Sequence, residues 1–170
     1  MEKRPLFHPA ASADIPTLQS LARVIWHEAY EDIIAPDQIA YMLDLMYATD
    51  VIAGELASGT VWEIIEYNGK ACGFISYGFS ENRAVKLSKI YISAEARGTG
   101  VSGTALERVI TYARENGRTS VYLTVNKQNR RAIRAYEKSG FHIVSATVFD
   151  IGHNFVMDDY VMETPAGKPL

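Results

Sequence analysis

The stretch ISAEARGTGVSGTALERVITYA, residues 92–113, places Gly98, Gly100 and Gly103 immediately before a helical pattern of apolar residues. Glycine lets the backbone approach a ligand closely, and the first amides of a helix have no partner within the helix. The same amides lie at the positive end of the helix dipole, so a glycine-rich helix start is typical of a phosphate-binding site. The rest of the sequence has to indicate which phosphate-bearing molecule binds there.

The composition limits the classes of protein to consider. The chain has 170 residues, of which 48% are hydrophobic, and we expect one domain over residues 1–163 followed by a tail at 164–170. A net charge of −3 without a basic block argues against nucleic acid as a partner. Cys72 is the only cysteine, which excludes an internal disulfide. Without an apolar run at the N-terminus or of the ~20 residues that span a bilayer, we expect a cytoplasmic protein with no membrane contact.

The spacing of apolar residues predicts the order of the elements. Helices are expected at 13–30, at 35–47 and at 129–140. A further helix is expected to begin after the glycine loop and to end at Asn116-Gly117. Two strands are expected around the turn Asn68-Gly69 within 59–80, and others at 83–93, 120–126, 141–151 and 154–163. This order predicts an α+β domain with a mixed sheet.

The strand at 83–93 changes the parity of its apolar residues. Val85 and Leu87 occupy odd positions, whereas Ile90 and Ile92 occupy even ones. A β-bulge near Ser88-Lys89 would restore the alternation. A strand that is buried on both faces would make parity uninformative, and the sequence leaves both explanations open.

Two common phosphate sites do not fit the glycines. Residues 98–103 satisfy G-x-G-x-x-G, but a dinucleotide site needs an acid at the end of the next strand, which here reads TVNKQN. A P-loop needs a lysine before its Ser or Thr, and here Gly103 precedes Thr104. Nicotinamide and ATP proteins are therefore disfavoured.

The segments IYISAEARGTGVSGTAL (90–106) and LTVNKQNRRAIRAYEKSGF (123–141) together resemble the GNAT superfamily of N-acetyltransferases. The family loop Arg/Gln-x-x-Gly-x-Gly/Ala corresponds to Arg97–Ser102, with Ser102 where the family prefers glycine or alanine. The downstream segment matches through Asn129, Ala132, Tyr136 and Gly140-Phe141, and the resemblance covers residues 60–163. It implies a mostly antiparallel sheet of about seven strands flanked by helices. The parallel pair 85–92/120–126 is expected to splay apart.

The resemblance implies acetyl-coenzyme A as the cofactor. His8, His142 and His153 lack metal-ligand spacing, so no metal is expected. The resemblance assigns cofactor binding to these residues: Ile90, Tyr91, Ile92, Arg97, Gly98, Thr99, Gly100, Val101, Ser102, Gly103, Asn129 and Tyr136. Backbone groups of Ile90 and Ile92 would pair with the pantetheine arm, and the amide of Tyr91 or Ile92 would polarise the thioester carbonyl. Arg97 would make a charge-assisted bond to the pyrophosphate. Asn129 also fits the N-cap of the following helix.

The implied activity is transfer of the acetyl group to a primary amine by direct attack in a ternary complex. Tyr136 is the candidate general acid, because a phenol with a pKa near ~10 is protonated at neutral pH and can give its proton to the leaving thiolate. A buried aromatic on a helix face would have the same sequence pattern. At the strand position where relatives often carry a glutamate base, this chain has Lys86. A water chain or a group from either end of the chain could serve instead, and the candidates are His27, Glu28, Tyr30, Asp158, Asp159 and Tyr160.

The first two helices carry many aromatic and acidic residues, a combination that suits a cationic amine. It resembles the acetyltransferases of polyamines and peptide amines, so the expected acceptor is a small polyamine-like molecule or a peptide or protein amine. The candidate acceptor-binding residues are Trp26, His27, Glu28, Tyr30 and Asp159. The alternative is that these residues are core aromatics and a solvated rim.

Two further questions stay open at the level of sequence. A non-catalytic acyl-CoA sensor or interaction domain of the same fold is the alternative function. The apolar last strands could join two chains into one sheet, and the sequence does not decide between a monomer and a homodimer.

Overall fold

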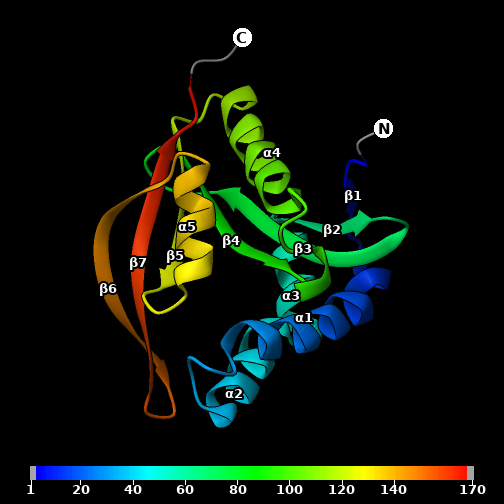
Figure 1. Ribbon diagram of the computed structural model, residues 1–170, viewed down its shortest axis with the longest axis vertical. Coiled ribbons are helices and arrows are strands. Elements are labelled where there is room, and N and C mark those ends of the chain that lie inside the picture. The colour runs from blue at the N-terminus through cyan, green and yellow to red at the C-terminus, as the bar shows by residue number, and fades with distance from the viewer. Residues whose placement is uncertain (1–2, 168–170) are drawn as a thin grey trace. The chain divides into compact units, whose positions relative to one another are not determined.

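The computed structural model describes residues 3–167, in which five α-helices accompany seven strands. The strands are hydrogen-bonded in the order β1-β2-β3-β4-β5-β7-β6. This confirms the predicted α+β class and the mixed, mostly antiparallel sheet. The chain forms two compact units, Met1–Gly78 with Lys89–Ala105 and Phe79–Ser88 with Leu106–Leu170, which we call unit 1 and unit 2. Figure 1 labels the helices and strands.

Unit 1 contains the N-terminal helices and the first hairpin. Its elements are β1 (Leu6–Pro9), η1 (Ser12–Asp14), α1 (Ile15–Tyr30), α2 (Pro36–Tyr47), α3 (Thr49–Ala57), β2 (Val61–Tyr67), β3 (Lys70–Phe79) and η2 (Ala94–Ala96). The last residue of β3, Phe79, is assigned to unit 2. The second half of β4 (Ala84–Ile92) also belongs to it. Asn68 and Gly69 have φ angles of 56° and 77°, so the predicted Asn-Gly turn connects β2 to β3 as expected.

An aromatic cluster forms much of the core of unit 1. It takes one ring from each of five elements: Trp26, Tyr47, Trp62, Phe74 and Tyr91. Neighbouring ring centroids within it lie 5.4–6.2 Å apart, mostly in tilted or edge-to-face arrangements. Because such pairs add specific geometry to apolar burial, the cluster fixes α1, α2 and the strands of this unit against one another.

Unit 2 contains the first half of β4, most of α4 (Val101–Glu115), β5 (Ser120–Asn126), α5 (Arg130–Lys138), β6 (His142–Gly152) and β7 (Phe155–Pro165). The parallel pairing of β4 with β5 runs from Ala84↔Ser120 to Lys86↔Tyr122. Strand β7 pairs antiparallel with both β5 and β6, and Figure 1 shows β6 and β7 as a long hairpin. The proposed splay of β4 from β5 stays a prediction.

Several elements differ from the sequence expectations. Strand β1 and helix α3 were not predicted, because β1 has four residues and α3 has nine with a glycine inside. Strand β7 continues to Pro165, two residues into the segment assigned to a tail, and residues 168–170 of that segment lie outside the described part. None of the helices within 3–167 combines the length and the apolar character needed to cross a membrane.

Strand β4 buries residues of both parities. Val85, Leu87 and Lys89 are buried at odd positions, and Ala84 and Ile92 at even positions. Lys86 and Ser88 are exposed, so one face is open to solvent in the first half of the strand, and the choice between the two explanations stays open.

Candidate active site

The glycine loop lies in unit 1 between η2 and α4. Gly98 and Gly100 have φ angles of 74° and 87°, in the left-handed region that favours glycine. A Cβ built on either residue would meet no atom within 4 Å, so the space beside the loop is open. The first hydrogen bond of α4 joins the amide of Thr104 to the carbonyl of Gly100 at 3.1 Å, leaving the preceding amides as the free N–H groups of the helix start. This cradle fits a pyrophosphate.

Hydrogen bonds connect the loop to the segment before it. The hydroxyl of Thr99 donates to the carbonyl of Ala96, and the amide of Arg97 donates to the carbonyl of Ala94 at 3.3 Å. The amide of Ala94 in turn donates to Oε2 of Glu28 on α1 at 3.2 Å. The position of the loop is therefore coupled to a side chain of the first helix.

The end of β4 is held by its neighbours in unit 1. A Cβ on Gly73 would lie 2.3 Å from the carbonyl oxygen of Tyr91, so β3 approaches this backbone as closely as glycine allows. The Tyr91 hydroxyl lies 3.1 Å from that of Tyr30. The amide of Ser93 donates to the carbonyl of Cys72 at 2.8 Å. These contacts fix the backbone to which the sequence assigns the pantetheine arm, Ile90–Ile92.

In unit 2, α5 carries the other two cofactor candidates. Asn129 is the N-cap, and its Oδ1 accepts a hydrogen bond from the amide of Ala132 at 3.4 Å, as the sequence predicts. Tyr136 lies two residues before the end of α5 and is 9% exposed. Its ring centroid is 6.0 Å from that of Phe141, whose amide donates to the Tyr136 carbonyl. The phenol is thus held on a capped helix by Phe141, which follows Gly140 just after the helix ends.

Asp159 of β7 is a buried carboxylate at the end of the strand pairing, opposite Asn126 of β5. Its pKa is raised to about 6, chiefly by burial and also by the charge of Asp158, while Lys127 opposes the rise. Within residues 3–167, Oδ1 of Asp159 has no hydrogen-bond partner. Lys127 Nζ lies 2.6 Å from Oδ1 of Asp158. Unit 2 therefore holds a carboxyl group that changes its charge close to physiological pH.

The remaining acceptor candidates are in α1. Trp26 and Tyr30 are buried in the aromatic core, and the indole N–H of Trp26 donates to the hydroxyl of Tyr47 at 2.8 Å. Burial raises the pKa of this Tyr47 hydroxyl well above its ordinary value. His27 is exposed, and Glu28 is partly exposed and bonded to Ala94 as described. Their contact with an acceptor stays a prediction.

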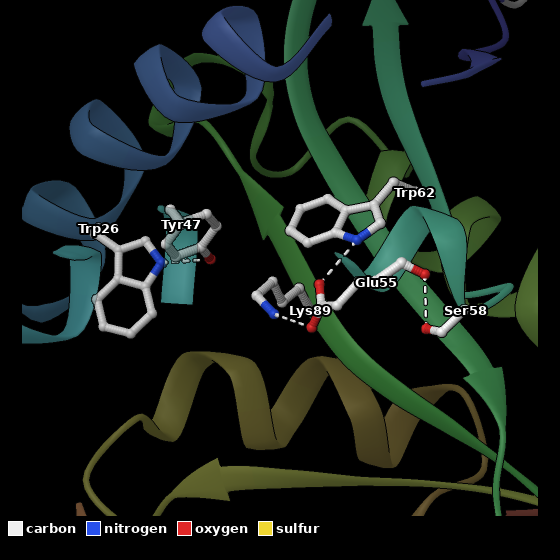
Figure 2. A network of polar contacts seen from close by, with 6 residues as sticks. All are labelled: Trp26, Tyr47, Glu55, Ser58, Trp62 and Lys89. Atoms are coloured by element: carbon white, nitrogen blue, oxygen red, sulfur yellow. Dashed lines mark hydrogen bonds and ion pairs between the residues drawn. The ribbon is translucent and has the colours of Figure 1, made fainter. Parts of the chain in front are cut away.

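A buried cation near these aromatics was not singled out from the sequence. Lys89 of β4 is 5% exposed, and its Nζ lies 4.9 Å from the ring centroid of Trp62, 5.6 Å from that of Tyr47 and 3.9 Å from Oε1 of Glu55 (Figure 2). The one indication in the sequence is that Lys89 occupies an odd position of the strand, as Val85 and Leu87 do. Lys86, which replaces the familiar glutamate, is exposed and pairs in register with Tyr122.

The mixed sheet, with parallel strands β4 and β5 connected through the glycine loop and α4, is the arrangement that the resemblance to the N-acetyltransferases implies. The model of the acetyltransferase (GNAT) family matches residues 18–141, and the chain belongs to this family. It is an N-acetyltransferase whose cofactor is acetyl-CoA.

Individual relatives agree with this assignment. An uncharacterized N-acetyltransferase of Mycobacterium tuberculosis is 31% identical over 130 residues, which are 76% of this chain and 83% of the relative. The streptothricin acetyltransferase of Streptomyces lavendulae is 28% identical over 93 residues, 54% of this chain and 49% of that enzyme. The crystal structure of the PaiA N-acetyltransferase of Thermoplasma acidophilum with coenzyme A has a TM-score of 0.81 at 19% identity and covers 95% of this chain and 98% of that one.

Proposed function

We propose that the protein transfers an acetyl group to a primary amine by direct attack in a ternary complex, with Tyr136 as the general acid. The observation that carries the proposal is the open loop with left-handed Gly98 and Gly100 before α4, in a chain of this family. Acetyl-CoA supplies the acetyl group as an activated thioester. All other requirements fall on residues of this chain.

Binding of the cofactor is assigned to two segments of unit 1. Arg97 and the amides of residues 98–103 bind the pyrophosphate, because an unsatisfied helix start and a guanidinium both favour an anion. Backbone groups of Ile90 and Ile92 bind the arm, and an amide of Tyr91 or Ile92 donates to the thioester carbonyl. The buried side chains around this strand support the proposal, since they fix the backbone donors in advance.

Proton transfer is assigned to two residues of unit 2. The nitrogen of the neutral amine forms a bond to the acetyl carbon while the carbon–sulfur bond breaks, and Tyr136 gives its proton to the departing sulfur. We infer that Asp159 accepts the proton which the amine loses. Its pKa of about 6 leaves it ionised at neutral pH and basic enough to act there.

The proposed acceptor is a cationic amine, either a small polyamine-like molecule or a peptide or protein amine. Asp159 of β7 is ionised at neutral pH, and a carboxylate attracts an ammonium group. A panel of spermidine, a lysine peptide, a peptide with a free N-terminus and streptothricin would identify the class of acceptor by its kcat/KM.

The decisive experiment compares the wild type with Tyr136→Phe. We expect kcat to fall by about 10²–10⁴-fold while the Kd for acetyl-CoA changes less than about twofold, because only proton transfer is lost. Equal turnover in the variant would overturn the role of Tyr136. Acetyl-CoA binding without turnover of any amine in the wild type would favour the alternative, a non-catalytic acyl-CoA sensor.

We also propose that two chains associate through β6. This strand ends the hydrogen-bonding order, and four of its apolar side chains are more than 40% exposed: Ile143, Val144, Val148 and Phe149. An exposed apolar edge strand is an open template for pairing with another chain, and a second copy of the same strand would satisfy its backbone groups.

A further inference from the structure

Unit 1 contains a cavity of about 540 Å³ whose lining includes Glu28, one of the acceptor candidates, but none of the residues assigned to the cofactor or to Tyr136 chemistry. One wall is the exposed side of α1, with Leu21, Val24 and Ile25 as its apolar part. The opposite side contains the start of β3 and the residues around η2, namely Lys70, Ala71, Ser93 and Glu95. A cavity of this size can hold a small organic molecule.

The charges at the cavity are unequal. Lys70 Nζ lies 3.0 Å from Oε2 of Glu95, so these two groups compensate each other at the rim. Glu28 is the remaining charged residue of the lining. Its Oε2 accepts the hydrogen bond from Ala94, but its Oε1 is buried and has no hydrogen-bond partner within residues 3–167. A carboxylate with a buried oxygen that lacks a partner is costly, and a cation bound beside the group would compensate its charge.

We propose that this cavity is an effector site for a small amphipathic amine, with the ammonium beside the carboxylate of Glu28 and the aliphatic tail on Leu21, Val24 and Ile25. The excess negative charge selects a cation, and the apolar wall selects a molecule with a hydrocarbon part. An inorganic cation would leave the apolar wall exposed, and a neutral alcohol would leave the carboxylate without a counter-charge.

The site also has a route to the glycine loop. Ala94 joins the two, because its amide donates to Glu28 and its carbonyl accepts from the amide of Arg97. An ammonium beside the carboxylate neutralises its charge and leaves the hydrogen bond from Ala94 to Oε2 in place. Occupation of the cavity should therefore stabilise the present position of η2 and increase the affinity of the loop for acetyl-CoA. This coupling rests on the proposed function, whereas the binding of the amine does not.

The test uses n-hexylammonium as the probe on the full chain, with 1-hexanol and hexanoate as controls, and follows binding by calorimetry and by NMR shifts. We expect hexylammonium to bind about tenfold or more tightly than hexanol, and hexanoate not to bind. Glu28→Gln should weaken hexylammonium about tenfold, because the amide keeps an acceptor for Ala94 and removes the charge. Glu31→Gln is the matched control on an exposed residue of the same helix end and should change nothing.

A second variant addresses the shape of the cavity. Ser20 is exposed and lines the cavity, so Ser20→Trp fills it without disturbing the core and should abolish binding while Tm is unchanged. Equal affinity for hexanol, or full binding by Glu28→Gln, would overturn the amine site.

Coupling is measured as the Kd for acetyl-CoA with and without saturating hexylammonium. We expect a Kd lower by about fivefold in the wild type and no change in Glu28→Gln. An unchanged Kd in the wild type would overturn the coupling. A wild type that does not bind acetyl-CoA at all would instead overturn the proposed function. The amine site would still be tested by the binding of hexylammonium alone.

Discussion

Lys89 and Glu55 form an ion pair in which the cation is buried and the carboxylate is accessible. Nζ lies 3.9 Å from Oε1, and the two side chains are 5% and 32% exposed. Oε2 of the same carboxylate accepts a hydrogen bond from the indole of Trp62 at 3.0 Å, over whose ring the ammonium lies (Figure 2). The aromatic and acidic groups that would suit a foreign cation here surround a lysine of the chain itself.

Removing the charge of Glu55 should therefore destabilise the fold. Glu55→Gln keeps an acceptor for Trp62 but leaves Lys89 without this carboxylate, and we expect a loss of about 1–3 kcal/mol in the free energy of unfolding, measured with urea. Lys89→Met should recover part of that loss in the double variant, since the buried charge is then absent. Strict additivity of the two single variants would show that the pair contributes nothing.

The close approach of β3 to β4 predicts the effect of adding one methyl group. Gly73→Ala would place Cβ 2.3 Å from the Tyr91 carbonyl oxygen, and we expect a loss of about 1–3 kcal/mol with weaker acetyl-CoA binding, because backbone has to move. Gly54→Ala in α3 is the matched control, where a Cβ meets nothing within 4 Å. It should stabilise the protein by about 0.5–1 kcal/mol. The reverse order of the two melting temperatures would contradict this account.

The glycine loop can be tested at two positions that differ in backbone conformation. Gly100→Ala has to adopt a φ of 87°, and the strain of about 1–2 kcal/mol should weaken acetyl-CoA binding by about 5–30-fold. Gly103 lies in the first turn of α4 with open space around it, so Gly103→Ala should change the Kd by less than about twofold. Isothermal calorimetry measures both, and equal losses would show that left-handed geometry is not what the loop supplies.

The parts of the fold that the sequence predicts are those governed by local rules. The turn at Asn68-Gly69, the Asn129 cap and the amphipathic helices depend on residues within a few positions of one another. The burial of Lys89 against Glu55 depends on β4 meeting α3, which no local pattern records. The same limit applies to Trp26 and Tyr30, where the sequence allowed either an acceptor-facing surface or core packing and the structure buries both.

The residues of the candidate site also differ in whether a local sequence pattern or only the fold identifies them. The cofactor loop was recognisable because glycine has a specific conformational reason to occur there. Asp159 was one of six residues considered for the base, and only its burial next to Asp158 distinguishes it, because burial sets the pKa of a carboxyl group and the sequence gives no burial.

The raised pKa of Asp159 predicts opposite effects on stability and on activity. A carboxyl whose folded pKa is about 6 binds more protons in the folded than in the unfolded chain, so stability decreases as pH rises from about 4 to 6. Asp159→Asn should thus be more stable by about 1–3 kcal/mol at pH 8, with the gain disappearing near pH 4. Its kcat/KM should fall at least about tenfold and lose the acid limb near pH 6.

Asp158→Asn is the control for this pH dependence. The charge of Asp158 raises the pKa of Asp159, so its removal should move the acid limb to lower pH while kcat is retained. Chemical denaturation and pH–rate profiles measure both effects. An acid limb that Asp159→Asn leaves in place would assign the base to another residue.

The exposed edge of β6 predicts the oligomeric state. Val148 is 62% exposed on this strand, and Val148→Lys places a charge on a surface that pairing with a second chain would bury, so the dimer should dissociate at least about tenfold more readily. Leu45→Lys on α2, 46% exposed in the wild type, is the matched control and should not affect assembly. Analytical ultracentrifugation over a concentration series gives both dissociation constants. A wild type that stays monomeric at its highest soluble concentration, or a Leu45→Lys variant that dissociates as readily as Val148→Lys, would remove β6 as the interface.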